Sequence, residues 1–255
     1  MMNSLERIER TFSKGKVLAA YLTAGDGGIQ HTLDAALALI AGGIDMLEIG
    51  VPFSDPIADG PVIQRAATRA LAAGTTLQEV LWLTKQIRAQ SDIPLILFSY
   101  YNPILSAMEK NFFHEAKQAG FDGALIIDCP IEESATFHQQ CLEEAIAPIY
   151  VITPSTPPER IRQIEQYGKG FLYYACRKGT TGLSDTLPAD FTEKIHAIKA
   201  LVKLPVLVGF GISQRNMTQQ VLQHADGVVV GSLFVKAVEE GMQPAELTAL
   251  ASSLR

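Results

Sequence analysis

The residue that stands out chemically is Glu48, an acid inside the apolar segment 44–50 (IDMLEIG). If this segment is a strand, the alternation of side chains places Glu48 on the same face as Met46 and Gly50. Burial of that face would disfavour the charged carboxylate and raise its pKa, which suits a group that donates and accepts a proton near neutral pH. The alternative role is structural, in which the acid pairs with an arginine or accepts hydrogen bonds from backbone amides.

Two further acids follow in the loop 51–61, where three prolines restrict the backbone. A stiff loop of this kind can hold Asp55 or Asp59 at a fixed distance from a ligand. Taken alone, each aspartate is better explained by turn chemistry, since Asp-Gly-Pro is a common turn and helix-start sequence. Beside an inward-facing Glu48, the same residues become a candidate acid/base group.

Three glycine-bearing segments later in the chain, at 179–182, 209–213 and 231–232, suggest an anion site. Glycine lets backbone amides approach an anion, and the first turn of a helix adds N–H groups that have no partner within the helix. Gly231 and Ser232 stand at the start of a predicted helix, 233–238, which suits a phosphate group bound by backbone amides. The alternative is that these glycines only form the tight turns that connect strands to helices.

Eight short apolar runs are predicted to be the strands that position these groups, at residues 17–22, 44–50, 94–100, 123–127, 147–152, 170–175, 205–209 and 227–230. Segments with apolar residues at three- and four-residue spacing lie between them and predict helices at 30–41, 76–90, 108–119, 132–144, 158–167, 189–201 and 216–224. Alternation of this kind is typical of parallel sheets, because crossover helices cover both faces. Eight units of about 32 residues each fit a closed (β/α)8 barrel better than an open doubly wound sheet.

Two further helices are predicted in addition to the eight strand–helix units. Residues 1–16 carry Leu5, Ile8 and Phe12 at helical spacing and predict an N-terminal helix. The long connection after the second strand contains an extra helix, 62–72, before the helix that follows Gly74. Because no linker or shift of composition divides the chain, we expect residues 1–255 to form one α/β TIM-barrel domain, with the loop 51–61 at its catalytic, C-terminal face.

Composition limits the partners and the compartment. The 255-residue chain has 21 basic and 27 acidic side chains, a formal net charge of −6, and its mild acidity argues against nucleic acid as the main partner. Its three cysteines show neither disulfide nor metal-binding spacing, so no metal site is expected and a reducing cytoplasm fits best. No run is long and apolar enough to predict a membrane span, and the charged N-terminal stretch is unlike a secretory signal.

The histidines and one aromatic cluster complete the polar candidates. All five histidines fall on predicted helices, away from strand ends, and are interpreted as helix-surface residues rather than catalysts: His31, His114, His138, His196 and His224. The cluster 100–103 (YYNP) follows the third predicted strand, where the substrate loops of a barrel lie. We therefore expect Tyr100 to contact a ligand or a partner.

The run 47–61 (LEIGVPFSDPIADGP) resembles the signature of the tryptophan synthase alpha subunit family, and the likeness extends over essentially the whole chain. The supporting segments are 21–26 (YLTAGD), 128–130 (DCP), 179–182 (GTTG), 209–213 (GFGIS) and 231–232 (GS). The resemblance implies a (β/α)8 barrel that cleaves indole-3-glycerol phosphate into indole and glyceraldehyde 3-phosphate without a metal or organic cofactor. It also implies an α2β2 complex, in which indole passes to a beta subunit that carries pyridoxal phosphate.

The same resemblance assigns roles to individual residues. Glu48 matches the acid/base that moves a proton between indole C3 and the C3′ hydroxyl, Asp59 the carboxylate that accepts the indole N–H, and Tyr173 a tyrosine near the glycerol part. Thr181 matches a residue that helps to close the strand-6 loop and to orient Asp59. Phosphate-binding amides are implied at Gly182, Gly211, Gly231 and Ser232, and indole-pocket positions at Tyr21, Phe98, Tyr100, Leu125 and Ile127.

Some positions depart from the usual family pattern. Cys176 stands where members usually have serine, Thr180 where they usually have valine, and Gly27 replaces a frequent proline. These changes affect loop closure and partner signalling more than the chemistry. A second hypothesis is therefore that the chain is a weakly active allosteric subunit that activates a beta partner. A third is that it is a different phosphosugar enzyme with the same barrel fold.

Overall fold

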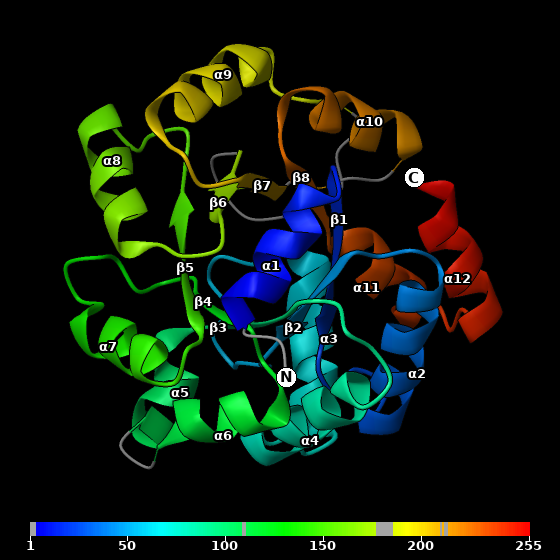
Figure 1. The fold of residues 1–255 in the computed structure, drawn as a ribbon. Helices are drawn as coiled ribbons and strands as arrows, with labels where there is room; N and C mark the ends of the chain where they lie inside the picture. Colours follow the sequence, from blue (N-terminus) through cyan, green and yellow to red (C-terminus); the bar gives the residue numbers. More distant parts are fainter. Residues whose placement is uncertain (1–3, 109–110, 177–185, 210, 212–213) are drawn as a thin grey trace.

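Eight parallel strands close into a barrel in the computed structural model, which describes residues 4–108, 111–176, 186–209, 211 and 214–255 (Figure 1). Each strand pairs with its neighbours in sequence, and β8 pairs with β1 to close the ring. The strands are β1 Val17–Thr23, β2 Met46–Gly50, β3 Leu95–Ser99, β4 Gly123–Ile126, β5 Ala147–Ile152, β6 Leu172–Ala175, β7 Val206–Gly209 and β8 Gly227–Val230. The predicted (β/α)8 barrel is therefore confirmed.

The helices surround the barrel, as the ribbon shows (Figure 1). They are α1 Ser4–Ser13, α2 Ile29–Ala41, α3 Pro61–Ala72, α4 Leu77–Arg88, α5 Tyr101–Met108, α6 Phe112–Ala119, α7 Ala135–Glu143, α8 Pro158–Tyr167, α9 Phe191–Leu201, α10 Arg215–His224, α11 Ser232–Glu239 and α12 Pro244–Ser253. The predicted N-terminal helix and the extra helix after the second strand are both present, as α1 and α3. Within the described residues, no helix has the length and apolar character that a membrane crossing requires.

The helices differ from the sequence prediction at three places. The helix predicted at 108–119 corresponds to α6, which begins after Asn111, whose φ of 63° is left-handed. Helix α5, at Tyr101–Met108, was not predicted. The last helix, α12, was not predicted. The side chain of Glu246 accepts a hydrogen bond from the backbone N–H of the N-cap Gln243 at 2.8 Å, Pro244 occupies the first turn, and the helix packs against α2.

The apolar residues form an inner and an outer cluster, as strand alternation requires. Met46, on the face that Glu48 shares, lies in the inner cluster, whereas Leu47 and Ile49 lie in the outer cluster between strands and helices. Helix α1 covers the N-terminal ends of the strands, where its Ile8 and Phe12 join the inner cluster. This end of the barrel is therefore filled, and an opening for a ligand has to lie at the other end.

Aspartates at the filled end connect neighbouring strands. Asp45, Asp122 and Asp226 each directly precede an even-numbered strand and accept a hydrogen bond from a backbone N–H of the odd-numbered strand before it, at 2.9, 3.0 and 3.0 Å. Each carboxylate also pairs with a cation: Arg255 with Asp45, Lys199 with Asp226, and Arg7 and Arg88 with Asp122. These contacts fix strand order and register far from the opening.

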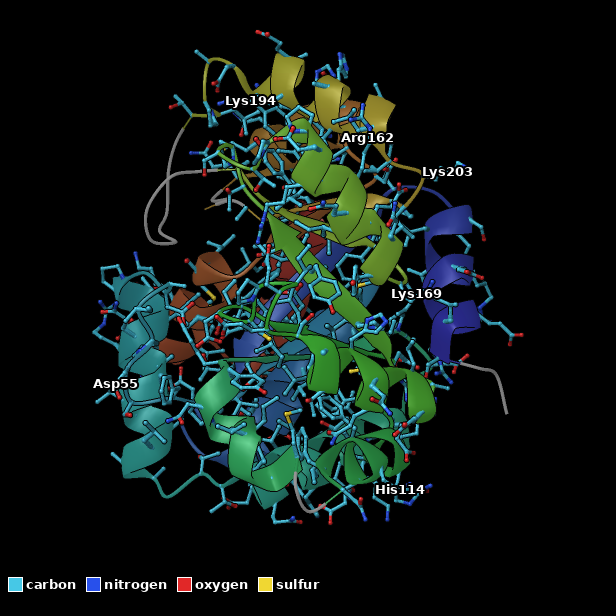
Figure 2. The ribbon with its side chains drawn as sticks, turned by 90° about the vertical axis from the view of Figure 1, so that its left-hand side faces the viewer. Asp55, His114, Arg162, Lys169, Lys194 and Lys203 are labelled. Carbon is cyan, nitrogen blue, oxygen red and sulfur yellow. The ribbon has the colours of Figure 1, made fainter. Side chains whose placement is uncertain are left out.

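The two ends of the barrel are visible in the turned view (Figure 2), with Asp55 on one side and Lys169 and Lys203 on the opposite side, beside α1. Asp55 belongs to the loop after β2, at the C-terminal ends of the strands. In barrels of this type, loops at that end carry the ligand site.

Candidate active site

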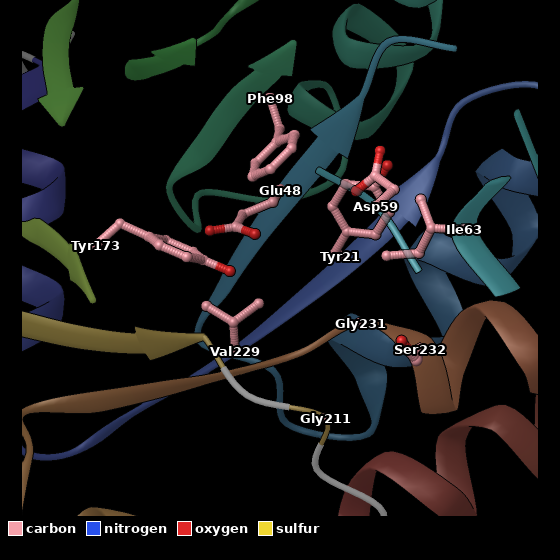
Figure 3. A pocket seen from close by; sticks show the side chains of 10 residues that line it. All are labelled: Tyr21, Glu48, Asp59, Ile63, Phe98, Tyr173, Gly211, Val229, Gly231 and Ser232. Atoms are coloured by element: carbon pink, nitrogen blue, oxygen red, sulfur yellow. The ribbon is translucent and has the colours of Figure 1, made fainter. Parts of the chain in front are cut away.

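A pocket of about 410 Å³, part of it open to solvent, lies at the C-terminal ends of the strands (Figure 3). It combines two carboxylates, three aromatic rings, a glycine after β7 and the start of helix α11. Its lining residues are Tyr21, Glu48, Asp59, Ile63, Phe98, Tyr173, Gly211, Val229, Gly231 and Ser232.

Glu48 points into this pocket from the middle of β2 (Figure 3). Its side chain is fully buried, and neither carboxylate oxygen has a hydrogen-bond partner among the described residues. Burial raises its pKa from the ordinary value of 4.5 to about 8. An acid with a structural role would have an arginine or backbone amides as partners, so the environment favours the alternative of a proton donor and acceptor.

Asp59 enters the pocket from the loop between β2 and α3. Its Oδ2 accepts a hydrogen bond from the hydroxyl of Tyr100 at 3.0 Å, and its backbone is held by bonds to Pro56 and Gln64. Burial raises the pKa of Asp59 to about 6, while the Tyr100 hydrogen bond acts in the opposite direction. The turn and the ligand interpretations of this residue are thus compatible, since the backbone forms the turn and the side chain faces the pocket.

Aromatic rings line the wall between the two acids. Tyr21 and Phe98 meet edge to face with ring centroids 5.3 Å apart, and Phe98 and Tyr173 lie 6.4 Å apart. Glu48 lies between Phe98 and Tyr173 in the close-up view (Figure 3). A flat apolar ligand would fit against such rings while its polar edge meets a carboxylate.

The opposite side of the pocket is formed by backbone. Gly231 is the N-cap of α11 and Ser232 is its first residue, with no side chain capping the helix. The first N–H groups of a helix lack partners within it and attract anions. Gly211, after β7, lies on the same side (Figure 3). Thr181 and Gly182, which are predicted to complete this side, lie outside the described residues.

Most of the predicted site residues meet in this one pocket, but three have other positions. Tyr100 is not among the lining residues of the pocket, but its hydroxyl donates a hydrogen bond to Asp59. Leu125 is fully buried within the inner cluster, because strand alternation directs it to the interior below the opening. Ile127 lies just beyond the end of β4 and lines a neighbouring cavity with Asp128, Cys129 and Thr153. Contact of Leu125 and Ile127 with a ligand stays a prediction.

Two lining residues were missed by the sequence reasoning. Val229 shares the inward face of β8 with Gly227 and Gly231, so the period of two that located Glu48 would have found it. Ile63 lies in the first turn of α3, and no local pattern distinguishes it from the other apolar residues of that helix. Among the described residues, no group of three or more His, Cys, Asp or Glu side chains is arranged to hold a metal ion.

Comparison with known proteins identifies the family. Residues 9–253 match the family model described as tryptophan synthase alpha chain. The tryptophan synthase alpha chain of Coxiella burnetii (strain CbuK_Q154) is 53% identical over 98% of this chain and 97% of its own length, and that of Chlamydia caviae is 47% identical over 98% of each.

Solved structures agree with these relatives. A chain of Mycobacterium tuberculosis tryptophan synthase superposes with a TM-score of 0.90 at 31% identity, covering 97% of this chain and 96% of that one. Tryptophan synthase subunit alpha from Legionella pneumophila gives a TM-score of 0.89 at 37% identity, with 100% and 97% covered. With a full-length family match, close relatives and the same barrel, this chain belongs to the tryptophan synthase alpha chain family.

Proposed function

We propose that the pocket cleaves indole-3-glycerol phosphate into indole and glyceraldehyde 3-phosphate by a retro-aldol reaction, which makes the protein a carbon–carbon lyase. The observation that carries this proposal is one pocket with a buried Glu48 that has no hydrogen-bond partner in the described part of the chain, a buried Asp59 and the N-terminus of α11. The three groups match the three parts of the substrate: the reacting carbons, the indole N–H and the phosphate.

The carboxyl group of Glu48, with its pKa of about 8, is largely protonated near neutral pH. It donates its proton to indole C3, and the ring nitrogen takes up the positive charge. The resulting carboxylate then removes the proton of the C3′ hydroxyl, a carbonyl forms at C3′, and the C3–C3′ bond breaks. The electron pair of that bond returns to the ring and restores neutral indole.

Asp59 accepts the indole N–H and stabilises the charge that develops on the nitrogen. A carboxylate in a closed, poorly hydrated site is weakly screened, so this interaction is strong in the transition state. Tyr173 lies beside Glu48, in the position of a group that contacts the glycerol part (Figure 3). Backbone amides at Gly211, Gly231 and Ser232 bind the phosphate, together with Gly182, and Thr181 helps to close the loop over the bound substrate.

These steps are proton transfers and the heterolytic cleavage of one carbon–carbon bond, with no net oxidation or reduction, so the proposal requires no metal or organic cofactor in this chain. We also propose that the protein is one cytoplasmic barrel domain that binds a beta subunit, where pyridoxal phosphate acts, in an α2β2 complex. The partner surface would include segments 52–55 and 128–130, Asn102 and 177–188. Two exposed apolar side chains next to these segments, Ile57 and Leu105, support this location.

The test is indole release by the purified chain supplied with indole-3-glycerol phosphate, measured alone and with a beta subunit. We expect indole in both cases and a loss of release in Glu48→Gln, which should still bind an indole-propanol phosphate analogue. Absence of indole in both cases would refute the lyase and leave the allosteric subunit as the better hypothesis. Near-normal turnover of Glu48→Gln would refute its role as the acid/base.

A further inference from the structure

A cluster of charged residues outside the pocket joins the two helices that begin at it. Arg69 of α3 makes two hydrogen bonds to the carboxylate of Asp26, at 2.7 and 2.8 Å, and one to Glu239 of α11, at 2.7 Å. We call these three residues the Arg69 clamp. Arg65, one turn earlier on α3, also binds Glu239, at 2.8 and 2.7 Å, but no contact joins it to Asp26.

The clamp has one anchor on the barrel. Asp26 is buried and follows β1, the strand that carries Tyr21, and its backbone N–H donates to Thr23. Two hydrogen bonds from a planar guanidinium fix direction as well as distance, and a buried acceptor shields them from water. Helix α3 is therefore held against the end of β1, rather than only packed beside it.

The other ends of these helices carry the two substrate-binding parts. Asp59 lies just before α3 and Ile63 in its first turn, whereas Gly231 and Ser232 begin α11. The close-up shows Ile63 and Ser232 on the same side of the pocket (Figure 3). Helix α11 packs against both α3 and β1, so movement of one helix relative to the other changes the separation of the carboxylate and the helix amides.

We infer that Arg69 is a positioning residue that sets the distance between the Asp59 subsite and the anion subsite at the start of α11. This inference rests on the proposed function, because it assumes a substrate whose indole and phosphate ends bind at the two subsites together. A ligand that binds at both ends gains affinity and reactivity only if the subsites keep the correct spacing. A ligand that binds at one end is indifferent to that spacing.

The contact between Arg69 and Glu239 stays charged near neutral pH. The hydrogen bond from Arg65, followed by the nearby charge of Arg69, holds the pKa of Glu239 at about 2, and the hydrogen bond to Asp26 raises the pKa of Arg69. This contact is therefore not a pH switch near neutrality.

The test compares three ligands by calorimetry: indole, glycerol 3-phosphate, and an indole-propanol phosphate that spans both subsites. For Arg69→Gln we expect the dissociation constant of the spanning ligand to rise by about tenfold or more and kcat to fall by a similar factor, because a small misplacement has large effects. Binding of indole and of glycerol 3-phosphate should change by less than twofold. Arg69→Lys keeps the positive charge but cannot make the two parallel hydrogen bonds to Asp26. It should therefore bind the spanning ligand better than Arg69→Gln and worse than the unmodified protein.

Arg65→Gln is the matched control, since it removes a neighbouring arginine on the same helix and leaves the clamp intact; its three affinities should equal those of the unmodified protein. Glu239→Gln weakens the contacts of both Arg69 and Arg65 with α11 and keeps the bond between Arg69 and Asp26, so it provides a second variant if Arg69→Gln fails to fold. An equal loss for all three ligands, or no loss for the spanning ligand, would overturn the inference. If the unmodified protein itself binds the spanning ligand no better than its parts, the proposed function fails instead.

Discussion

Two carboxylates in one pocket have different environments, and this difference matches their proposed roles. Glu48 has no polar partner among the described residues, so its pKa of about 8 keeps it protonated near neutral pH. Asp59 has the Tyr100 hydroxyl as a partner, and its pKa of about 6 leaves it mostly charged. Environment alone thus separates the proposed proton donor from the proposed charge stabiliser, as it does in other acid/base enzymes.

Burial of Glu48 should make stability depend on pH. Its pKa is about 8 in the folded state against an ordinary 4.5, so between these values the folded protein binds more protons, and its free energy of unfolding falls as pH rises. We expect Glu48→Gln to equal the unmodified protein near pH 4.5 and to exceed it by on the order of 4 kcal/mol above pH 8. Urea unfolding at both pH values measures this, with the exposed Glu193→Gln as control. A variant that is no more stable at high pH would contradict the buried environment.

Asp59→Asn removes the charge while keeping the shape of the side chain. We expect turnover to fall on the order of a hundredfold or more, because the nitrogen of indole loses a close counter-charge in the transition state. Steady-state rates of indole release measure this loss. A loss of less than tenfold would be too small for the proposed role.

Tyr100→Phe tests the environment of Asp59 without removing the carboxylate. The hydroxyl of Tyr100 donates to the charged form of Asp59 and so lowers its pKa; without it, the pKa should rise above about 6. The unmodified protein should show a bell-shaped kcat/KM profile with limbs near pH 6 and 8, and in Tyr100→Phe the acidic limb should move to higher pH. An unchanged acidic limb would show that another group controls it.

At the scale of elements, the tyrosines of the pocket depend on glycines at the ends of neighbouring strands. A Cβ atom built on Gly50 of β2 would lie 2.2 Å from the hydroxyl oxygen of Tyr21 on β1, and one on Gly209 of β7 would lie 2.1 Å from that of Tyr173 on β6. Each ring therefore leans over the last residue of the adjacent strand. The pairing of each glycine-ending strand with its neighbour therefore also determines the space that the tyrosine ring can occupy.

Gly209→Ala should displace the ring of Tyr173. We expect the dissociation constant of the indole-propanol phosphate analogue to rise by about tenfold, and the free energy of unfolding to fall by about 1–3 kcal/mol through overpacking. Gly168→Ala is the control, because its added Cβ would meet no atom closer than 3.4 Å. Calorimetry and urea unfolding of both variants measure the two effects. Unchanged affinity in Gly209→Ala would show that the position of the Tyr173 ring does not affect binding of the analogue.

At the scale of the whole molecule, the residues that line the pocket and those that tie the strands together lie at opposite ends of the barrel. The pocket occupies the C-terminal ends, whereas Asp45, Asp122 and Asp226 join strands at the N-terminal ends. A substitution at the N-terminal ends of the strands can therefore change the free energy of unfolding without touching a residue of the pocket.

Asp122→Ala tests this separation. Asp122 is buried and pairs with Arg7 and Arg88. Its removal leaves Arg88 without its ion-pair partner and Arg7 with only the exposed Asp92, and should lower the free energy of unfolding by about 3 kcal/mol or more. Affinity for the indole-propanol phosphate analogue should stay within twofold. Asp92→Ala, an exposed partner of Arg7 and Arg10, is the control and should cost less than about 1 kcal/mol. A large loss of ligand affinity in Asp122→Ala would mean that the two ends are coupled.

Local sequence patterns predicted the repeating strand–helix units and the alternation of side chains along each strand. Alternation along β2 placed Glu48 on the inner face, and the regular exchange of strands and helices predicted the barrel. The same patterns could not show that the side chain of Asp59 turns into the pocket, nor that Ile63 joins it, because both depend on how α3 packs. The contacts of Arg69 with Asp26 and Glu239 join residues 43 and 170 positions apart, which no local period can detect.

The strand-joining aspartates also bear on the order of folding. Their backbone contacts span only 27, 27 and 20 residues and tie β1 to β2, β3 to β4, and β7 to β8. Closing such short loops has a low entropic cost, and local contacts favour rapid folding. Before β6 the chain has no such aspartate, and Phe171 packs against Phe12 of α1 instead. We therefore expect three strand pairs to gain protection early in refolding, and β5 and β6, which no such aspartate joins, to gain it later. Pulsed hydrogen exchange would record this order.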